Sequence, residues 1–143
     1  MISVISRSEE ETRRMGENVA KLLKGGEVIA LSGNLGSGKT TFVKGLARGF
    51  GIRKAITSPT YILFRPYKLR RGRVFYHFDL YRLKSVRELS ELGLHEILEN
   101  GKNIVAIEWP QKAKKFLPKG TIHIRFTHGK KPNERLVTIW SKK

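Results

Sequence analysis

The sequence predicts an α/β fold of the P-loop NTPase class, with a mostly parallel sheet flanked by helices and an antiparallel hairpin. Residues 27–32 form a short apolar run, typical of a buried parallel strand, and the glycine-rich segment 33–40 follows directly. Apolar residues then recur at helical spacing from Val43 to Phe50. A strand, a glycine loop and a helix in this order are the setting in which a P-loop occurs.

The first elements are predicted as a short strand over residues 2–5 and a helix that begins at Ser8. Ser8 and Glu11 have the spacing of a capping box, which satisfies free N–H groups at a helix start. Gly25 and Gly26 supply the stop. The inner face of this helix is predicted to carry Thr12, Met15, Val19, Leu22 and Leu23.

A hairpin is predicted in the middle of the chain. Residues 57–60 form a rigid turn that leads into a strand at 61–64. A basic loop at 68–72 then turns the chain back into a second strand at 74–79.

The second half of the chain is predicted to hold one helix and three strands. The helix spans 85–99 and is weakened around Gly93, and a buried-type strand follows at 103–108. Two further strands are predicted near the end, at 121–126 and 136–140. A chain of 143 residues is one domain's worth, and we expect a single domain over 1–143.

Composition narrows the class of protein. The chain has no cysteine, which excludes a disulfide framework and a thiolate metal site, and no apolar run long enough to span a membrane. We therefore expect a cytoplasmic protein without membrane contact. The net charge of +17 has two interpretations: a surface for RNA or another polyanion, or a charge-rich surface that serves solubility.

The glycine-rich segment fits G-x-x-x-x-G-K-[ST], and its residue types suit phosphate binding. Gly33, Gly36 and Gly38 let the backbone curl so that successive N–H groups converge on phosphate oxygens. Lys39 reaches the β- and γ-phosphates, and the Thr40 hydroxyl is placed to ligate Mg²⁺. The alternative is a glycine turn that precedes Lys-Thr by chance.

Two acids, Asp79 and Glu108, end predicted strands. In an open α/β sheet, ligands bind beyond the carboxyl ends of parallel strands, so both carboxylates are candidates for the site. Glu108 is the better candidate for the metal. Asp79 has three possible roles: to hold a metal-bound water, to orient the nucleophile, or to cap the turn at 80–82.

Four further residues each have more than one interpretation: Thr60, His77, Arg82 and Trp109. Thr60 either senses the γ-phosphate or only satisfies the backbone of its turn. Arg82 either neutralises transition-state charge or is a solvated side chain. His77 lies between two aromatic residues and is predicted to be packed rather than catalytic. Trp109 covers a nucleotide pocket, presents a partner surface or is a core aromatic.

The sequence favours ATP over GTP, because it has no Asn-Lys-x-Asp or Thr-Lys-x-Asp stretch to read guanine. The chain also contains four sequence motifs in a fixed order and spacing, at 33–42, 58–61, 77–83 and 107–110. They read Gly-Asn-Leu-Gly-Ser-Gly-Lys-Thr-Thr-Phe, Ser-Pro-Thr-Tyr, His-Phe-Asp-Leu-Tyr-Arg-Leu and Ile-Glu-Trp-Pro. This set closely resembles the bacterial TsaE (YjeE) family, the ATPase component of tRNA threonylcarbamoyladenosine biosynthesis.

The resemblance implies a small P-loop fold that binds ATP or ADP with Mg²⁺ and hydrolyses ATP slowly when alone. It implies action on TsaD and TsaB, which transfer a threonylcarbamoyl group to adenosine 37 of tRNA. Lys39, Asp79 and Glu108 would be catalytic, and Thr40 and Glu108 would hold Mg²⁺. The implied nucleotide-binding residues are Glu9, Gly33, Leu35, Gly36, Ser37, Gly38, Lys39, Thr40, Thr41, Thr60 and Trp109.

The sequence therefore predicts a monomeric Mg²⁺-dependent ATPase that serves tRNA modification through protein partners. Two alternatives stay open at this point: a P-loop kinase of a small molecule, and a basic RNA-binding module. The basic segment 65–73 is not part of the family pattern, so direct contact with tRNA is an open question.

Overall fold

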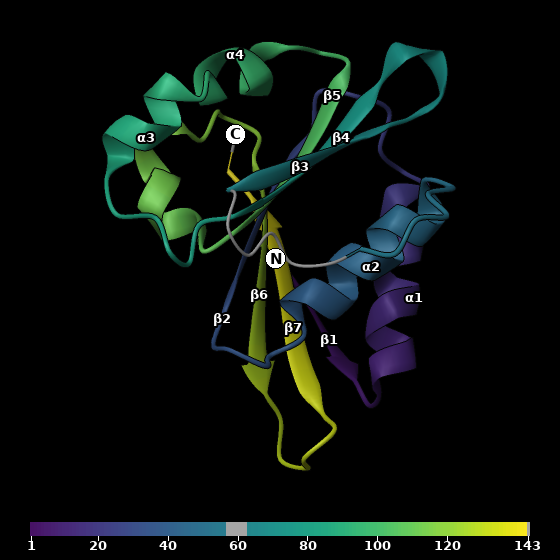
Figure 1. The fold of residues 1–143 in the computed structure, drawn as a ribbon. Coiled ribbons are helices and arrows are strands. Elements are labelled where there is room, and N and C mark those ends of the chain that lie inside the picture. Colours follow the sequence, from purple (N-terminus) through teal and green to yellow (C-terminus); the bar gives the residue numbers. More distant parts are fainter. Residues whose placement is uncertain (57–62, 143) are drawn as a thin grey trace.

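The computed structural model describes residues 1–56 and 63–142, and within them a seven-stranded sheet with helices on both faces (Figure 1). Of the sequence predictions, the turn at 57–60, including Thr60, and the first part of the strand at 61–64 lie outside the described residues. The elements are β1 (Ile2–Ser6), α1 (Glu9–Ala20), β2 (Val28–Gly33), α2 (Lys39–Gly49), β3 (Phe64–Lys68), η1 (Arg70–Gly72), β4 (Val74–Asp79), α3 (Val86–Glu91), α4 (Leu94–Glu99), β5 (Asn103–Glu108), η2 (Pro110–Phe116), β6 (Ile122–His128) and β7 (Arg135–Ser141).

The sheet is mixed, which corrects the prediction of a mostly parallel one. Its strand order is β1-β7-β6-β2-β5-β4-β3. The four central strands β6, β2, β5 and β4 are parallel, whereas β1, β7 and β3 pair antiparallel with their neighbours. Both hairpins, β3–β4 and β6–β7, have connections too short for a parallel crossover, which explains their direction. The predicted hairpin at the β3 edge is confirmed, but its first strand is Phe64–Lys68 rather than 61–64.

Alternating residues of the central strands supply two cores. In β2 and β5, Ile29 and Ile104 pack beneath α1 and α2, whereas Val28 and Val105 belong to the cluster beneath α3, α4 and η2. Because successive strand residues point to opposite faces, a strand covered on both sides must be apolar throughout. The continuous apolar runs at 27–32 and 103–108 therefore predicted these two strands correctly.

Helices α1 and α2 approach closely because glycines face the partner helix. A Cβ atom added at Gly45 would lie 2.0 Å from the Arg13 carbonyl oxygen, and one at Gly16 would lie 2.3 Å from the Phe42 carbonyl oxygen. The buried residues of α1 are accordingly small: Thr12, Gly16 and Ala20. The prediction that Leu22 belongs to the inner face is wrong, since α1 ends at Ala20 and Leu22 is 76% exposed.

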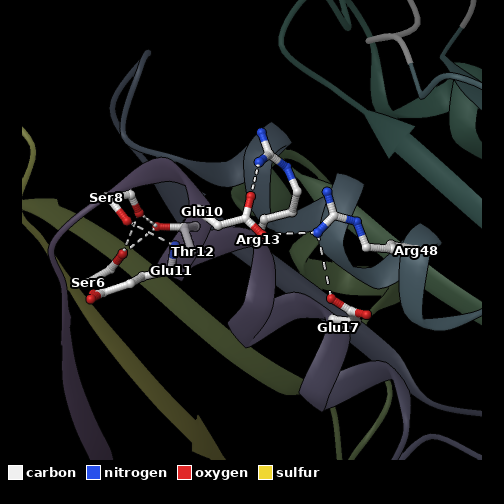
Figure 2. Close-up of polar contacts among 8 residues, drawn as sticks. All are labelled: Ser6, Ser8, Glu10, Glu11, Thr12, Arg13, Glu17 and Arg48. Carbon is white, nitrogen blue, oxygen red and sulfur yellow. Dashed lines mark hydrogen bonds and ion pairs between the residues drawn. The ribbon is translucent and has the colours of Figure 1, made fainter.

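The start of α1 is held by a polar network, which Figure 2 shows. The Ser8 hydroxyl accepts a hydrogen bond from the Glu11 amide at 3.1 Å, so the predicted cap is confirmed. The Glu11 carboxylate accepts from the Arg7 amide at 2.6 Å, one residue before the cap. The hydroxyls of Ser6 and Thr12 lie 2.6 Å apart and tie the end of β1 to the helix.

The same view shows how α1 is joined to α2 (Figure 2). Glu10 pairs with Arg13 at 2.6 Å and with Arg48 of α2 at 3.1 Å, and Arg48 also lies 3.7 Å from Glu17. These groups are exposed or partly exposed, so solvent screens the pairs and each contributes little to stability. Together with the glycine contacts, they set the position of the α1 start relative to the loop that begins α2.

The second half differs from the sequence prediction in two places. The predicted helix 85–99 is two short helices, α3 and α4, which break at Gly93, where φ is +79°. The 3₁₀ segment η2 was not predicted, because its Pro110 start and basic residues show no helical periodicity. Among the described residues, no helix is long and apolar enough to cross a membrane.

Candidate functional site

A cavity of about 330 Å³ lies at the carboxyl ends of β2, β4 and β5, where the chain passes from β2 into α2. The start of α1 and the β6–β7 hairpin border it as well. Its lining residues are Ser8, Glu9, Thr12, Leu35, Gly36, Ser37, Gly38, Lys39, Thr40, Thr41, Asp79, Tyr81, Glu108, Trp109, Asn133 and Arg135.

The glycine-rich loop at 33–38 has a positive φ at each of its three glycines, a conformation that other residues adopt only with strain. Gly33 has a φ of +142°, and a Cβ atom there would lie 2.5 Å from the Phe126 carbonyl oxygen. Gly38, with a φ of +111°, directly precedes the first residue of α2. The Ser37 hydroxyl is buried and has no hydrogen-bond partner among the described residues. The loop thus offers backbone N–H groups at a helix N-terminus and an unsatisfied hydroxyl, which suits an anionic ligand.

Lys39 is the first residue of α2 and is only 5% exposed. Its ammonium group donates to the Gly33 carbonyl oxygen and lies 3.8 Å from the centroid of the Trp109 ring. Burial lowers the pKa of Lys39, and the carboxylates of Glu108 and Asp79 partly offset that effect. A desolvated cation of this kind interacts strongly with an anion that enters the cavity.

Glu108 ends β5 and is 3% exposed. The Thr40 hydroxyl donates to its two carboxylate oxygens at 3.3 and 3.4 Å. The Nε2 atom of His77, from β4, lies 2.6 Å from Glu108 Oε2. The sequence prediction that His77 is packed is confirmed, since the side chain is fully buried, but its contact with Glu108 was not foreseen. That contact depends on β4 lying beside β5 in register.

Asp79 ends β4 and pairs in register with Glu108 of β5. Its Oδ1 atom accepts a hydrogen bond from the Tyr81 amide at 3.1 Å, so the residue does cap the turn that follows. The pKa of Asp79 is raised, mainly by burial; the Tyr81 amide opposes this effect and the Glu108 charge adds to it. The Asp79 carboxylate therefore favours a proton or a cation more than an exposed aspartate does.

A pH-dependent stability difference follows from Asp79. Its raised pKa means that the folded protein holds the proton more tightly than the unfolded chain, so this group lowers stability as pH rises through the raised pKa. Asp79→Asn is expected to be more stable than the wild type at neutral pH, and the gain is expected to vanish below the ordinary aspartate pKa. Urea unfolding from about pH 3 to pH 7.5 measures it. A pH-independent difference would contradict the assignment.

Trp109 adopts a left-handed backbone conformation, with φ 60° and ψ 51°, between β5 and η2. This conformation costs a non-glycine residue about 1–2 kcal/mol, and such strain is concentrated at functional sites. The ring lies 5.0 Å from the ring of Tyr81, and Lys112 donates to the Tyr81 carbonyl oxygen at 2.6 Å. The aromatic pair thus forms a fixed wall beside Lys39.

The structure brings most of the predicted site residues to this one cavity. Glu9, Leu35 and Thr41 line it together with the loop, whereas Arg82 is exposed and is not among its lining residues. Thr60 lies outside the described residues. Five lining residues were not predicted as site residues: Ser8, Thr12, Tyr81, Asn133 and Arg135. Of these, Ser8 and Thr12 had been considered only as helix residues.

Arg135 is the missed residue with the clearest contact to the loop. It begins β7 and is half-buried, and its Nη2 atom donates to the Gly36 carbonyl oxygen at 3.2 Å. Its Nη1 atom donates to the carbonyl oxygens of Pro132 and Glu134. No local pattern in the sequence indicates this position, because it results from the pairing of β7 with β6 beside β2.

The side-chain atoms of the cavity that could coordinate a metal ion are mainly oxygens, and they do not form a cluster rich in nitrogen or sulfur ligands. Within 1–56 and 63–142, no group of three or more His, Cys, Asp or Glu residues is arranged to hold a metal ion. The Thr40 hydroxyl and the Glu108 carboxylate are hard oxygen ligands, with Asp79 beside them. Mg²⁺ prefers this chemistry, and it commonly takes one or two protein ligands and completes its shell with water and phosphate.

Comparison with known proteins decides the family. The family described as threonylcarbamoyl adenosine biosynthesis protein TsaE matches residues 6–137. The chain belongs to the TsaE family. The tRNA threonylcarbamoyladenosine biosynthesis protein TsaE of Treponema pallidum is 43% identical over 121 residues, which cover 84% of this chain and 87% of that protein. Its counterpart from Aquifex aeolicus is 42% identical over 113 residues, 78% of each chain.

A solved structure supports the same conclusion for the fold. The crystal structure of YdiB from Bacillus subtilis matches with a TM-score of 0.78 and 28% sequence identity. The match covers 99% of this chain and 86% of YdiB. The TsaE resemblance predicted from the four sequence blocks is therefore confirmed, and the family places the protein in tRNA threonylcarbamoyladenosine biosynthesis.

Proposed function

We propose that this TsaE protein is a Mg²⁺-dependent ATP hydrolase, a single P-loop domain over residues 1–143 that works in the cytoplasm as a monomer. It serves the threonylcarbamoyl modification of adenosine 37 in tRNA by acting on a TsaD–TsaB complex. The observation that carries the proposal is that Lys39, Asp79 and the Thr40–Glu108 pair converge on the cavity beside the glycine-rich loop.

The loop binds the phosphates of ATP or ADP in this proposal. Backbone N–H groups of 36–38 and the N-terminus of α2 attract the phosphate oxygens, and the buried Ser37 hydroxyl gains the partner that it lacks among the described residues. Lys39 exchanges its contact with the Gly33 carbonyl for the β- and γ-phosphates. Gly33 and Thr41 complete the loop, and Glu9, Leu35 and Trp109 border the rest of the nucleotide.

Thr40 and Glu108 would hold Mg²⁺, which when bound neutralises the charge that develops on the transferred phosphoryl group. Their oxygens already face each other at 3.3 and 3.4 Å, which supports a shared ligand. His77 holds the Glu108 carboxylate from the side of β4. Asp79 orients the attacking water and accepts its proton, a role that its raised pKa favours.

Slow turnover by the isolated protein follows from the cations available at the cavity. Besides Lys39, the cation in contact with the loop among the described residues is Arg135, and its N–H groups donate to three backbone carbonyl oxygens. An arginine supplied to a P-loop from outside raises the rate by about 10³–10⁵-fold. Stimulation by TsaD–TsaB is consistent with such a missing contribution.

The proposal is tested by phosphate release from ATP with Mg²⁺, measured for the protein alone and with TsaD–TsaB added. Slow release that rises at least tenfold with the partners is the expected result. Release that does not respond to the partners removes the proposed action on the complex. If labelled phosphate appears in a small acceptor instead of free phosphate, the protein is a kinase and the hydrolase proposal fails.

A further inference from the structure

A group of basic residues lies at the end of the sheet opposite the cavity. The central strands β6, β2, β5 and β4 are parallel, so the connections that precede them meet at one end, which is the upper part of Figure 1. We call the basic residues of these connections, together with the one that follows β7, the basic edge. It consists of Lys21, Lys24, Arg70, Arg71, Arg73, Lys102, Lys119 and Lys142.

Hydrogen bonds to backbone carbonyl oxygens hold the connections of the basic edge together. Val74, at the start of β4, donates to the Lys102 carbonyl oxygen at 3.2 Å, and the Arg73 guanidinium donates to the Lys24 carbonyl oxygen at 3.4 Å. At the other side, the Gly120 amide donates to the Lys142 carbonyl oxygen at 3.0 Å. Residues far apart in the sequence thus present their charges on one surface, which spans four strand spacings, or about 19 Å, from β4 to β7.

The basic edge carries a large excess of positive over negative charge. Seven of its residues are exposed and Arg73 is half-buried, and none of the eight forms an ion pair among the described residues. The connections 21–27, 69–73, 100–102 and 117–121 contain one acid, Glu27. Its carboxylate accepts from the amides of Lys24 and Gly25, at 3.0 and 2.8 Å.

An uncompensated surface of this kind is typical of a site for a polyanion. Clustered like charges destabilise a folded chain by self-repulsion, and binding of phosphates with release of counterions reverses that effect. Arginine guanidinium groups bind phosphate oxygens in a bidentate manner. The connections expose one large apolar side chain, Leu22, whereas a stable protein interface has an apolar core. These features favour a nucleic acid backbone over an acidic protein.

We propose that the basic edge binds the phosphate backbone of RNA while the cavity at the opposite end stays accessible to nucleotide. RNA binding itself rests on the charges described above, and the identification of that RNA as the tRNA of the modification pathway rests on the proposed function. Binding is expected to be salt-dependent and tolerant of sequence, because phosphate contacts carry no base information.

The test is fluorescence anisotropy of a labelled, unmodified tRNA transcript over a series of salt concentrations. The edge variant combines Lys24→Ala, Arg70→Ala, Arg71→Asn and Lys102→Ala; asparagine suits the positive φ of 62° at position 71. The matched control combines Lys114→Ala, Lys115→Ala, Lys130→Ala and Lys131→Ala, which removes the same charge from exposed positions elsewhere.

The edge variant is expected to bind at least tenfold more weakly and to reduce the slope of log K against log salt by about 3, for four lost contacts. The control is expected to lose less than threefold. Equal losses in both variants, or competition by polyglutamate as strong as that by RNA, would overturn the proposal. ATP binding is measured on the same proteins and shows whether each variant is folded. If the wild type does not bind ATP, the proposed hydrolase function fails, but the RNA-binding result can still be interpreted.

Discussion

Lys39→Ala is expected to weaken ATP binding by at least about 100-fold, because it removes charge-assisted hydrogen bonds worth about 1.5–3 kcal/mol each. The side chain is nearly buried beside the loop, where it is shielded from water. Isothermal titration with ATP and Mg²⁺ measures the affinity, and phosphate release is expected to fall to background.

Lys44→Ala is the matched control, since Lys44 is an exposed lysine of the same helix. It removes the same charge and is expected to leave the affinity for ATP unchanged. The folded state is expected to tolerate Lys39→Ala, because burial already lowers the pKa of Lys39 and so disfavours its charged form. If Lys39→Ala and Lys44→Ala bind ATP equally, the loop is not the phosphate site.

Glu108→Gln is expected to lower Mg²⁺-dependent ATP turnover by on the order of 100-fold or more, with a smaller effect on nucleotide binding in the presence of EDTA. Glutamine keeps an oxygen and an amide at hydrogen-bond distance from Thr40 and His77, but it removes the negative charge that would hold the metal ion. Phosphate release as a function of Mg²⁺ concentration distinguishes weaker metal binding from slower chemistry.

Glutamine is the informative substitution because of the buried histidine. Alanine at position 108 would leave the Nε2 atom of His77 without its partner, and Nδ1 already has none among the described residues. An unsatisfied buried group costs about 1–3 kcal/mol, so an alanine variant would mix a loss of stability with a loss of metal binding. Glu91→Gln, at an exposed position of α3, is the control, and a wild-type Mg²⁺ response in Glu108→Gln would contradict the metal role of Glu108.

Local patterns in the sequence were sufficient for several elements of this protein. The apolar runs predicted β2 and β5, the Ser8–Glu11 spacing predicted the start of α1, and the glycine segment predicted a loop with positive φ before α2. Each of these features leaves a local pattern of residue types in the sequence. Such a pattern can be recognised without knowing which segments pair. The family was also recognisable from four short blocks, and the comparisons confirm it.

Only the tertiary structure decided which distant residues meet. The mixed sheet, the His77–Glu108 contact and the position of Arg135 on the loop all depend on strand order and register. The same order collects the cations of the basic edge at one end of the sheet. A sequence records the periodicity of each strand, but pairing between strands is selected by the packing of the whole chain. The sequence by itself therefore determined the local elements and the family, and the tertiary structure determined how the candidate site and the basic edge are assembled.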